Sequence, residues 1–255
     1  MRRYVIAGNW KMNKTVAEAT ETAAELRRLV AQFRDCDIII APTYTAIWPV
    51  AQKLVDSNVS VCAQEVYFEE SGAFTGAISA KMVKEAGCQY ALIGHSERRQ
   101  IFGETLETSR KRMQAAFDAG LTPILCIGET LEEREAGRTL EVVGEQLDAA
   151  IAGFDLATLE NMIVAYEPVW AIGTGKVATP QQAQDVHAGI RERLRYVGQD
   201  LAAGMRLLYG GSVKPANAKE LMSQEDIDGV LVGGASLQAE SFAGIVKISP
   251  DLLIA

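Results

Sequence analysis

The sequence predicts an α/β protein folded as a single (β/α)8 barrel, with eight parallel strands inside an outer ring of helices. Short runs rich in β-branched residues alternate with amphipathic stretches along the whole chain. Most of the short runs are continuously apolar, which is typical of parallel strands covered on both faces. No linker, charge block or change of composition interrupts the 255 residues, so one domain over residues 1–255 is expected.

Eight segments are expected to form the strands: residues 4–8, 38–41, 59–63, 90–93, 122–127, 163–166, 206–209 and 229–232. An open doubly wound sheet is the alternative fold. Such a sheet usually carries a glycine-rich nucleotide loop after its first strand. Here the first strand ends in Gly8-Asn9-Trp10-Lys11-Met12-Asn13, which is not that loop, so the barrel is favoured.

Three of the helices are well signalled by their ends. A Thr15…Glu18 capping box begins the first, and Thr179-Pro180, a cap followed by proline at the first helical position, begins the second. A third closes near Gly120. Apolar residues recur at helical spacing in each: Val16, Ala19, Ala23, Leu26, Val30 and Phe33; Val186, Ile190, Leu194 and Val197; and Leu106, Met113 and Phe117.

Composition and charge exclude several classes of function. The formal net charge of −8 argues against nucleic acid or an anionic membrane as a partner. No segment approaches the ~18 apolar residues of a membrane span, and no signal peptide is expected. The cysteines are scattered without paired spacing, which predicts reduced, mostly buried thiols in a cytoplasmic protein: Cys36, Cys62, Cys88 and Cys126.

The most informative segment spans residues 163–175. An apolar run ends in Glu167, and Pro168, a bulky Trp170 and the loop Gly173-Thr174-Gly175 follow. By itself a glutamate is most often a solvated surface charge. A carboxylate at a strand tip, followed by a loop with a stiff start and a permissive end, instead predicts a base under a closing lid.

Further polar and glycine-rich segments follow the other expected strands. In a barrel, the carboxyl ends of the strands form one rim, where the chemistry takes place. Each segment has an ordinary explanation: a solvated lysine, a capping or core histidine, plain strand-to-helix turns. Together they place a base, an imidazole, an ammonium group and two glycine turns on one rim: Asn9 and Lys11; His95-Ser96-Glu97; Glu167; Gly210-Gly211-Ser212; and Gly233-Gly234.

This set predicts proton abstraction next to a carbonyl. Glu167 would remove the proton from carbon, and His95 and Lys11 would stabilise the charge of the enediolate oxygen. The glycine turns, with short helices beginning near Ser212 and Ala235, would bind a phosphate through backbone N–H groups. His95 and His187 form no ligand pattern, so no metal is expected, and no motif indicates a cofactor. His187 is expected to be structural.

Six segments, in order along nearly the whole chain, resemble the triosephosphate isomerase family. They are Gly8-Asn9-Trp10-Lys11-Met12-Asn13, Gly72-Ala73-Phe74-Thr75-Gly76, Ile93-Gly94-His95-Ser96-Glu97-Arg98-Arg99, residues 165–175, Tyr209-Gly210-Gly211-Ser212-Val213 and Leu231-Val232-Gly233-Gly234-Ala235-Ser236-Leu237. The resemblance implies a TIM barrel that interconverts dihydroxyacetone phosphate and D-glyceraldehyde 3-phosphate without cofactor or metal. A glutamate base, a neutral histidine electrophile and a closing loop are the established features of this family.

The resemblance also implies a role for each site residue. Glu167 is the base, His95 the electrophile and Lys11 the cation near substrate oxygen and phosphate, with Asn9 helping to bind substrate. Glu97 is similar to a buried carboxylate that orients the region of Lys11 and His95. Cys126 packs close to the site. Phosphate contacts are implied for Gly173, Ser212, Gly233 and Gly234, and the lid is implied to comprise Pro168, Val169, Trp170, Ala171, Ile172, Gly173, Thr174, Gly175 and Lys176.

A homodimer is implied as well, because the family is normally dimeric. The loop at residues 64–79, with Phe74, Thr75 and Gly76 at its tip, would dock beside the partner's site. Two positions depart from the usual pattern: Glu65 replaces an amide, and Ala77 replaces a glutamate that could pair with an arginine such as Arg98. An unpaired Glu65 charge buried at the interface would be costly, so these changes bear on interface strength.

Two other functions remain open from the sequence. A phosphosugar aldolase acting through a Schiff base would need a lysine within a barrel strand, and none of the expected strands contains one. A barrel that only binds triose phosphate would not need the full set of Lys11, His95 and Glu167.

Overall fold

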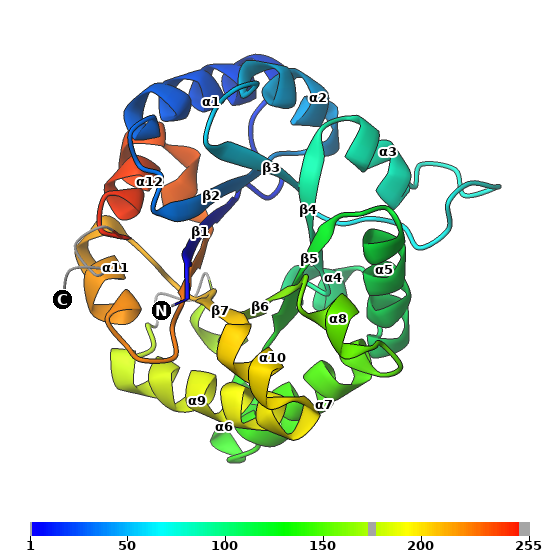
Figure 1. The fold of residues 1–255 in the computed structure, drawn as a ribbon, viewed down its shortest axis with the longest axis vertical. Coiled ribbons are helices and arrows are strands. Elements are labelled where there is room, and N and C mark those ends of the chain that lie inside the picture. Colours follow the sequence, from blue (N-terminus) through cyan, green and yellow to red (C-terminus); the bar gives the residue numbers. More distant parts are fainter. Residues whose placement is uncertain (1, 173–176, 250–255) are drawn as a thin grey trace.

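The computed structural model describes residues 2–172 and 177–249 and has the expected architecture, a closed barrel of parallel strands paired in chain order (Figure 1). β8 pairs with β1 through residues such as Gly229 and Val5, which closes the ring and excludes the open sheet. The strands are β1 Tyr4–Asn9, β2 Cys36–Ala41, β3 Val59–Ala63, β4 Cys88–Ile93, β5 Thr122–Ile127, β6 Ile163–Tyr166, β7 Arg206–Tyr209 and β8 Gly229–Val232.

The last four strands and β3 have the predicted bounds, whereas β1, β2 and β4 are longer than predicted. β1 continues to Asn9, and β2 and β4 each begin two residues earlier, at Cys36 and Cys88. The polar side chains of Asp37 and Gln89 interrupt the apolar runs there. Main-chain pairing does not depend on side-chain polarity, and Asp37 still pairs with Val5 of β1.

Helices surround the strands, as Figure 1 shows. The capping box at Thr15 and Glu18 and the proline at the start of the helix after Thr179 are confirmed. Gly120 has φ +69° just after its helix, a conformation that favours glycine. The helices are α1 Val16–Val30, α2 Tyr44–Lys53, α3 Ala80–Glu85, α4 Ser96–Ile101, α5 Leu106–Asp118, α6 Leu131–Glu135, α7 Thr139–Ile151, α8 Leu156–Leu159, α9 Pro180–Val197, α10 Gln199–Gly204, α11 Pro215–Met222 and α12 Ala239–Val246, with 3₁₀ turns η1 Val169–Ala171 and η2 Gly234–Leu237.

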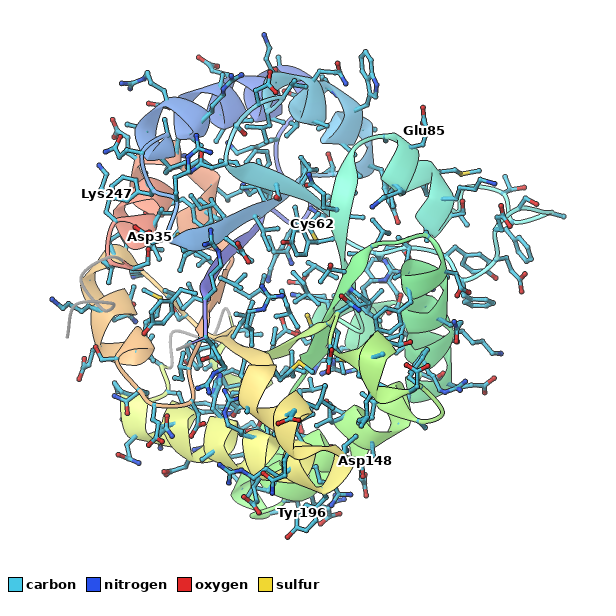
Figure 2. All side chains as sticks on the ribbon, in the orientation of Figure 1. Asp35, Cys62, Glu85, Asp148, Tyr196 and Lys247 are labelled. Atoms are coloured by element: carbon cyan, nitrogen blue, oxygen red, sulfur yellow. The ribbon has the colours of Figure 1, made fainter. Side chains whose placement is uncertain are left out.

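The buried core has two layers. The larger layer lies between strands and helices, and a smaller one fills the barrel with side chains such as Val5, Ile39, Leu92 and Leu208. Cys62, labelled inside the ring of strands in Figure 2, belongs to this inner layer. All four cysteines are free and buried, as predicted. Because side chains fill the barrel, a ligand can bind only at its rim.

One long segment extends beyond the ring of helices. Residues 64–79, between β3 and α3, project outward at the right of Figure 1. A bridge between Tyr67 and Ser79 closes the base of this loop, and its outer part, residues 69–76, is exposed. No helix within the described ranges is long and apolar enough to cross a membrane.

Candidate active site

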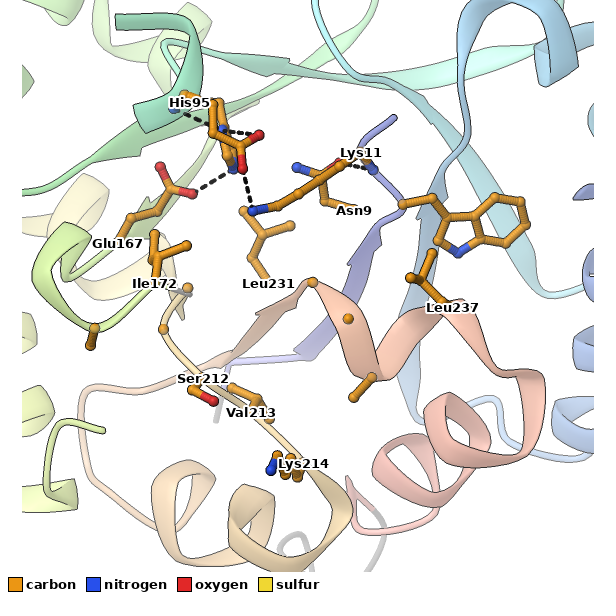
Figure 3. Close-up of a pocket in the computed structure, with 18 of the residues that line it drawn as sticks. Asn9, Lys11, His95, Glu167, Ile172, Ser212, Val213, Lys214, Leu231 and Leu237 are labelled. Carbon is orange, nitrogen blue, oxygen red and sulfur yellow. Dashed lines mark hydrogen bonds and ion pairs between the residues drawn. The ribbon is translucent and has the colours of Figure 1, made fainter. Parts of the chain in front are cut away.

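A cavity of about 730 Å³ opens at the carboxyl ends of the strands (Figure 3). Residues from β1, the start of α4, the end of β6 and the two glycine turns line it together. The predicted rim is therefore one continuous site. Its lining includes Asn9, Lys11, His95, Glu97, Glu167, Ala171, Ile172, Ser212, Gly233 and Gly234.

Glu167 is the most enclosed carboxylate of the cavity, with 1% of its surface exposed. One carboxylate oxygen accepts a hydrogen bond from His95 Nε2 at 2.8 Å, and the other accepts one from the Ser96 backbone N–H at 3.0 Å. The main-chain N–H of Glu167 donates to Ile127 O at 2.7 Å, which extends the β5–β6 pairing by one residue. A base fixed in this way is shielded from water before any ligand binds.

His95 is the residue that caps α4, and its ring is almost fully buried. Its Nδ1 accepts the backbone N–H of Glu97 at 3.3 Å. A nitrogen that accepts a hydrogen bond carries no proton, so the proton of the imidazole is on Nε2, which donates to Glu167. This arrangement fits a neutral ring that can give a hydrogen bond to an oxygen in the cavity.

The surroundings of Glu167 set the pKa of its carboxyl. Burial alone would raise this pKa, but the adjacent His95, the nearby guanidinium of Arg99 and the Ser96 N–H outweigh burial and hold it below the ordinary value. The positive charge of Arg99 and the hydrogen bonds from His95 and Ser96 all favour the ionised carboxylate. Glu167 therefore remains ionised in mildly acidic solution.

We expect this lowered pKa to appear in a direct titration of the Glu167 carboxyl. The midpoint should lie below pH 4.5, the ordinary value for glutamate, because the folded protein stabilises the ionised form. By linkage, the stability that Glu167 contributes is present above the unfolded value and is lost in the same acid range. The carboxyl ¹³C chemical shift of Glu167, assigned by comparison with Glu167→Gln and followed at stepped pH with the fold checked at each step, tests this. A midpoint above the ordinary value contradicts it.

Lys11 has an unusual backbone conformation that three neighbours hold in place. Its φ is +51°, which is uncommon for a residue with a side chain. Its N–H donates to Asn9 Oδ1 at 2.9 Å, and its carbonyl accepts from Gln64 Nε2 at 2.8 Å. Its ammonium group pairs with Glu97 Oε1 at 2.6 Å (Figure 3). Strain of this kind often accompanies a functional position.

The expectation of a buried Glu97 is wrong. Its side chain is 39% exposed at the rim of the cavity, where it pairs with Lys11. A residue at the first turn of α4 faces the cavity on one side and solvent on the other. Glu97 does connect the two residues that it was expected to orient, because its backbone N–H donates to His95 while its carboxylate binds Lys11.

The glycine turns approach the site closely, but the short helix after the first of them begins later than predicted. A Cβ at Gly210 would lie 2.9 Å from Glu167 Cγ, and one at Gly233 would lie 3.7 Å from Lys11 Cε. α11 begins at Pro215 rather than near Ser212, because proline favours the first helical position. The second prediction is confirmed, because the short 3₁₀ helix η2 begins at Gly234, next to Ala235, and α12 follows it.

The described part of the predicted lid begins as a short turn. Pro168 leads into η1, and Ile172 follows it. Residues Gly173, Thr174, Gly175 and Lys176 lie outside the described residues.

Glu129, which sequence reasoning missed, is fully buried and accepts hydrogen bonds from Trp170 Nε1 at 3.0 Å and Tyr166 OH at 3.1 Å. The sequence did contain an indication of Glu129, because it follows the end of β5, at the rim, in a Gly-Glu-Thr turn.

The predicted interface residues lie on or beside the loop at residues 64–79. Phe74 is 40% exposed and packs near Tyr67, and Thr75 and Gly76 are exposed. The expectation that a buried Glu65 would be unpaired is wrong for this chain. Its carboxylate accepts a hydrogen bond from Arg112 Nη1 at 2.7 Å. Sequence separation concealed this partner, since Arg112 lies on α5.

Two other predictions concern residues outside the reactive set. His187 is fully buried, with Nδ1 2.7 Å from Ala183 O, and burial lowers the pKa of its imidazole, as suits a structural residue. Burial and the nearby Glu167 raise the pKa of the Cys126 thiol, so it does not provide a thiolate. Among residues 2–172 and 177–249, no group of three or more His, Cys, Asp or Glu is arranged to hold a metal ion.

Comparisons with known proteins agree with one another. The family model described as triosephosphate isomerase matches residues 4–249. The chain is 54% identical to the triosephosphate isomerase of Trichlorobacter lovleyi and 52% identical to that of Pelobacter propionicus, over 97% of this chain and 99% of each relative. The crystal structure of triosephosphate isomerase from Bartonella henselae has a TM-score of 0.89 with 39% identity, covering 97% of this chain and 99% of that one.

Proposed function

The chain belongs to the triosephosphate isomerase family, and from this premise we propose how its own residues interconvert dihydroxyacetone phosphate and D-glyceraldehyde 3-phosphate. In this proposal Glu167 is the base, His95 the electrophile and Lys11 the cation of the site. Asn9 and Glu97 position Lys11. The support is geometric, because these five side chains line one cavity.

The reaction begins when the Glu167 carboxylate takes a proton from the carbon next to the carbonyl. The electron pair of the broken C–H bond forms the C=C bond of an enediolate, and negative charge moves to the carbonyl oxygen. The Nε2–H of His95 and the ammonium group of Lys11 stabilise that oxygen. Return of the proton from Glu167 to the neighbouring carbon, with the hydroxyl proton passing between the two oxygens, completes the isomerisation.

The contacts of Glu167 also explain what substrate binding has to change. Both of its carboxylate oxygens accept hydrogen bonds, from His95 and from the Ser96 backbone. These bonds weaken a carboxylate as a base, because they stabilise its ionised form. When the substrate carbonyl oxygen accepts the hydrogen bond from His95 Nε2–H, Glu167 loses that bond. Glu167 is then free to move toward the substrate carbon.

The phosphate of the substrate is held mostly by backbone groups in this proposal. Ser212, Gly233 and Gly234 line the same cavity as Glu167, with Lys11 beside Gly233. Glycine turns allow a phosphate to reach main-chain N–H groups. This suits a protein whose net charge of −8 would otherwise repel a dianion. Gly173 and the rest of the lid, Pro168 to Lys176, are proposed to close over the phosphate.

The observation that carries this proposal is the 2.8 Å contact between His95 Nε2 and the buried Glu167 carboxylate, in a cavity that Lys11 also lines. Exchange of solvent deuterium into dihydroxyacetone phosphate tests it directly. The proposed base produces exchange together with turnover in a coupled assay. A barrel that only binds triose phosphate would show saturable binding with no exchange, and that result would overturn the proposal.

We propose that the protein is a homodimer joined through the loop at residues 64–79. The support is an exposed Phe74 on a loop that projects from the ring of helices. Phe74→Asp should produce monomers in sedimentation, because a charge would replace an apolar contact. Tyr196→Asp is the matched control, since Tyr196 is an exposed aromatic residue on α9. A dimer that persists in the Phe74 variant contradicts the assignment.

The remaining proposals concern the cell and the domain. We propose that the protein acts in the cytoplasm, in glycolysis and gluconeogenesis, and that residues 1–255 form one barrel domain. Support comes from the family and from a match that runs without interruption over residues 4–249.

A further inference from the structure

The main chain around Glu167 is hydrogen-bonded to residues 127–129, which are the last residue of β5 and the two residues after it. Glu167 N–H donates to Ile127 O at 2.7 Å, and Val169 N–H donates to Glu129 O at 3.2 Å. Gly128 lies between these two bonds. A Cβ at Gly128 would lie 1.8 Å from the Glu167 carbonyl oxygen, so its backbone packs directly against the peptide of the base. Any movement of Gly128 is therefore transmitted to Glu167.

Gly128 has no side chain to hold it, and Gln146 supplies two of the bonds that do. The Gly128 N–H donates to Gln146 Oε1 at 2.7 Å, and Gln146 Nε2 donates back to Gly128 O at 3.1 Å. The side-chain amide thus satisfies both polar groups of this residue. Gln146 is on α7, which lies outside β5 in Figure 1.

Arg99 provides a second attachment for the same residue. Its Nη2 donates to Gly128 O at 3.2 Å, and its Nη1 donates to Cys126 O at 2.8 Å and to Gly94 O. Gly94 immediately precedes His95 in sequence. Arg99 therefore joins the tip of β4, which carries the imidazole, to the tip of β5, which supports the base.

We propose that Gln146 is a positioning residue that holds Glu167 in reach of the substrate carbon by fixing Gly128. The proposal depends on the role of Glu167 as the base. Proton transfer from carbon requires close alignment, and a displacement of about 1 Å can lower the rate by roughly 10²-fold. Glycine has the widest backbone freedom of any residue, so Gly128 needs such an external attachment.

The core packing of α7 does not require this amide. The buried residues of α7 are Val142, Val143, Leu147, Ala150 and Ile151, whereas Gln146 is only half-buried. Replacing its polar atoms should therefore change the position of Gly128 more than the stability of the helix. A loss of kcat without a loss of stability would therefore separate a positioning role from a purely structural one.

Gln146→Met tests the proposal, because methionine keeps the length of the side chain and removes both hydrogen bonds. We expect kcat to fall by about tenfold with KM within about twofold of the parent value, a smaller loss than for a full 1 Å shift because Arg99 still holds Gly128. Val143→Ala, one turn earlier on α7, is the control for lost stability. It should lower the Tm and leave kcat unchanged.

Gln146→Glu provides a second readout that does not depend on how well the first variant folds. The ionised carboxylate can accept the Gly128 N–H but repels its carbonyl, whereas a protonated carboxyl can also donate to that carbonyl. The kcat of this variant should rise relative to the parent as the pH is lowered and the introduced carboxyl takes up its proton. A ratio to the parent that stays constant with pH overturns the proposal.

Two further results would each overturn it. One is a Gln146→Met variant with parental kcat and a lowered Tm, and the other is a raised KM at unchanged kcat. Glu167→Gln in the same assay separates this inference from the proposed function. If that variant retains turnover, the base assignment fails and the positioning role fails with it. If it is inactive while Gln146→Met matches the parent, only the positioning role fails.

Discussion

Glu167→Gln should lower kcat by roughly 10³- to 10⁴-fold and abolish deuterium exchange into dihydroxyacetone phosphate, because an amide has no basic lone pair at neutral pH. The amide oxygen can still accept one of the two hydrogen bonds that His95 and Ser96 now donate. The fold and the phosphate contacts should therefore persist. Binding of inorganic phosphate within a few-fold of the parent would establish that chemistry, rather than folding, is lost.

Two companion variants sharpen this experiment. Glu167→Asp keeps the carboxylate but withdraws it by about one methylene, and a loss of roughly 10²-fold is expected from misplacement alone. Glu107→Gln removes an exposed carboxylate on α5 that pairs with Lys111, and it should leave turnover unchanged. Proton exchange in Glu167→Gln at the parental rate would remove Glu167 from the mechanism.

Lys11→Met is expected to lower kcat by roughly 10²- to 10³-fold, since it removes a preorganised positive charge from the oxygen that becomes negative. KM should rise as well, because Lys11 lies beside Gly233 of the proposed phosphate turn. The structure predicts little loss of stability, because Glu97, the partner left behind, is 39% exposed and can be hydrated. Steady-state kinetics and a melting curve measure these effects.

The appropriate control for Lys11→Met is Lys84→Met. Lys84 Nζ binds the carbonyl of Gly120 on the protein surface and has no contact with the cavity. Its loss should leave both kinetic constants at parental values. A Lys11→Met enzyme whose kcat is unchanged would show that the ammonium group is not needed at the reacting oxygen.

The arrangement of strands could be predicted because it follows from local patterns. Buried parallel strands such as β5 and β6 consist of apolar residues in unbroken runs, and capping residues such as Thr15 and Thr179 begin helices in any context. The predicted bounds were wrong where a polar side chain interrupts a strand, as at Asp37. They were also wrong where a turn precedes the start of a helix, as before Pro215.

The sequence by itself determined the barrel, the position of Glu167 at a strand tip, and the set of residues at the rim. Only the tertiary structure decided which atoms meet: His95 Nε2 with Glu167, Glu97 with Lys11, and Gln146 with Gly128. The physical reason is distance along the chain. Periodicity and caps depend on neighbours within a few residues, whereas each of these contacts joins residues far apart along the chain that meet only when the strands and helices pack together.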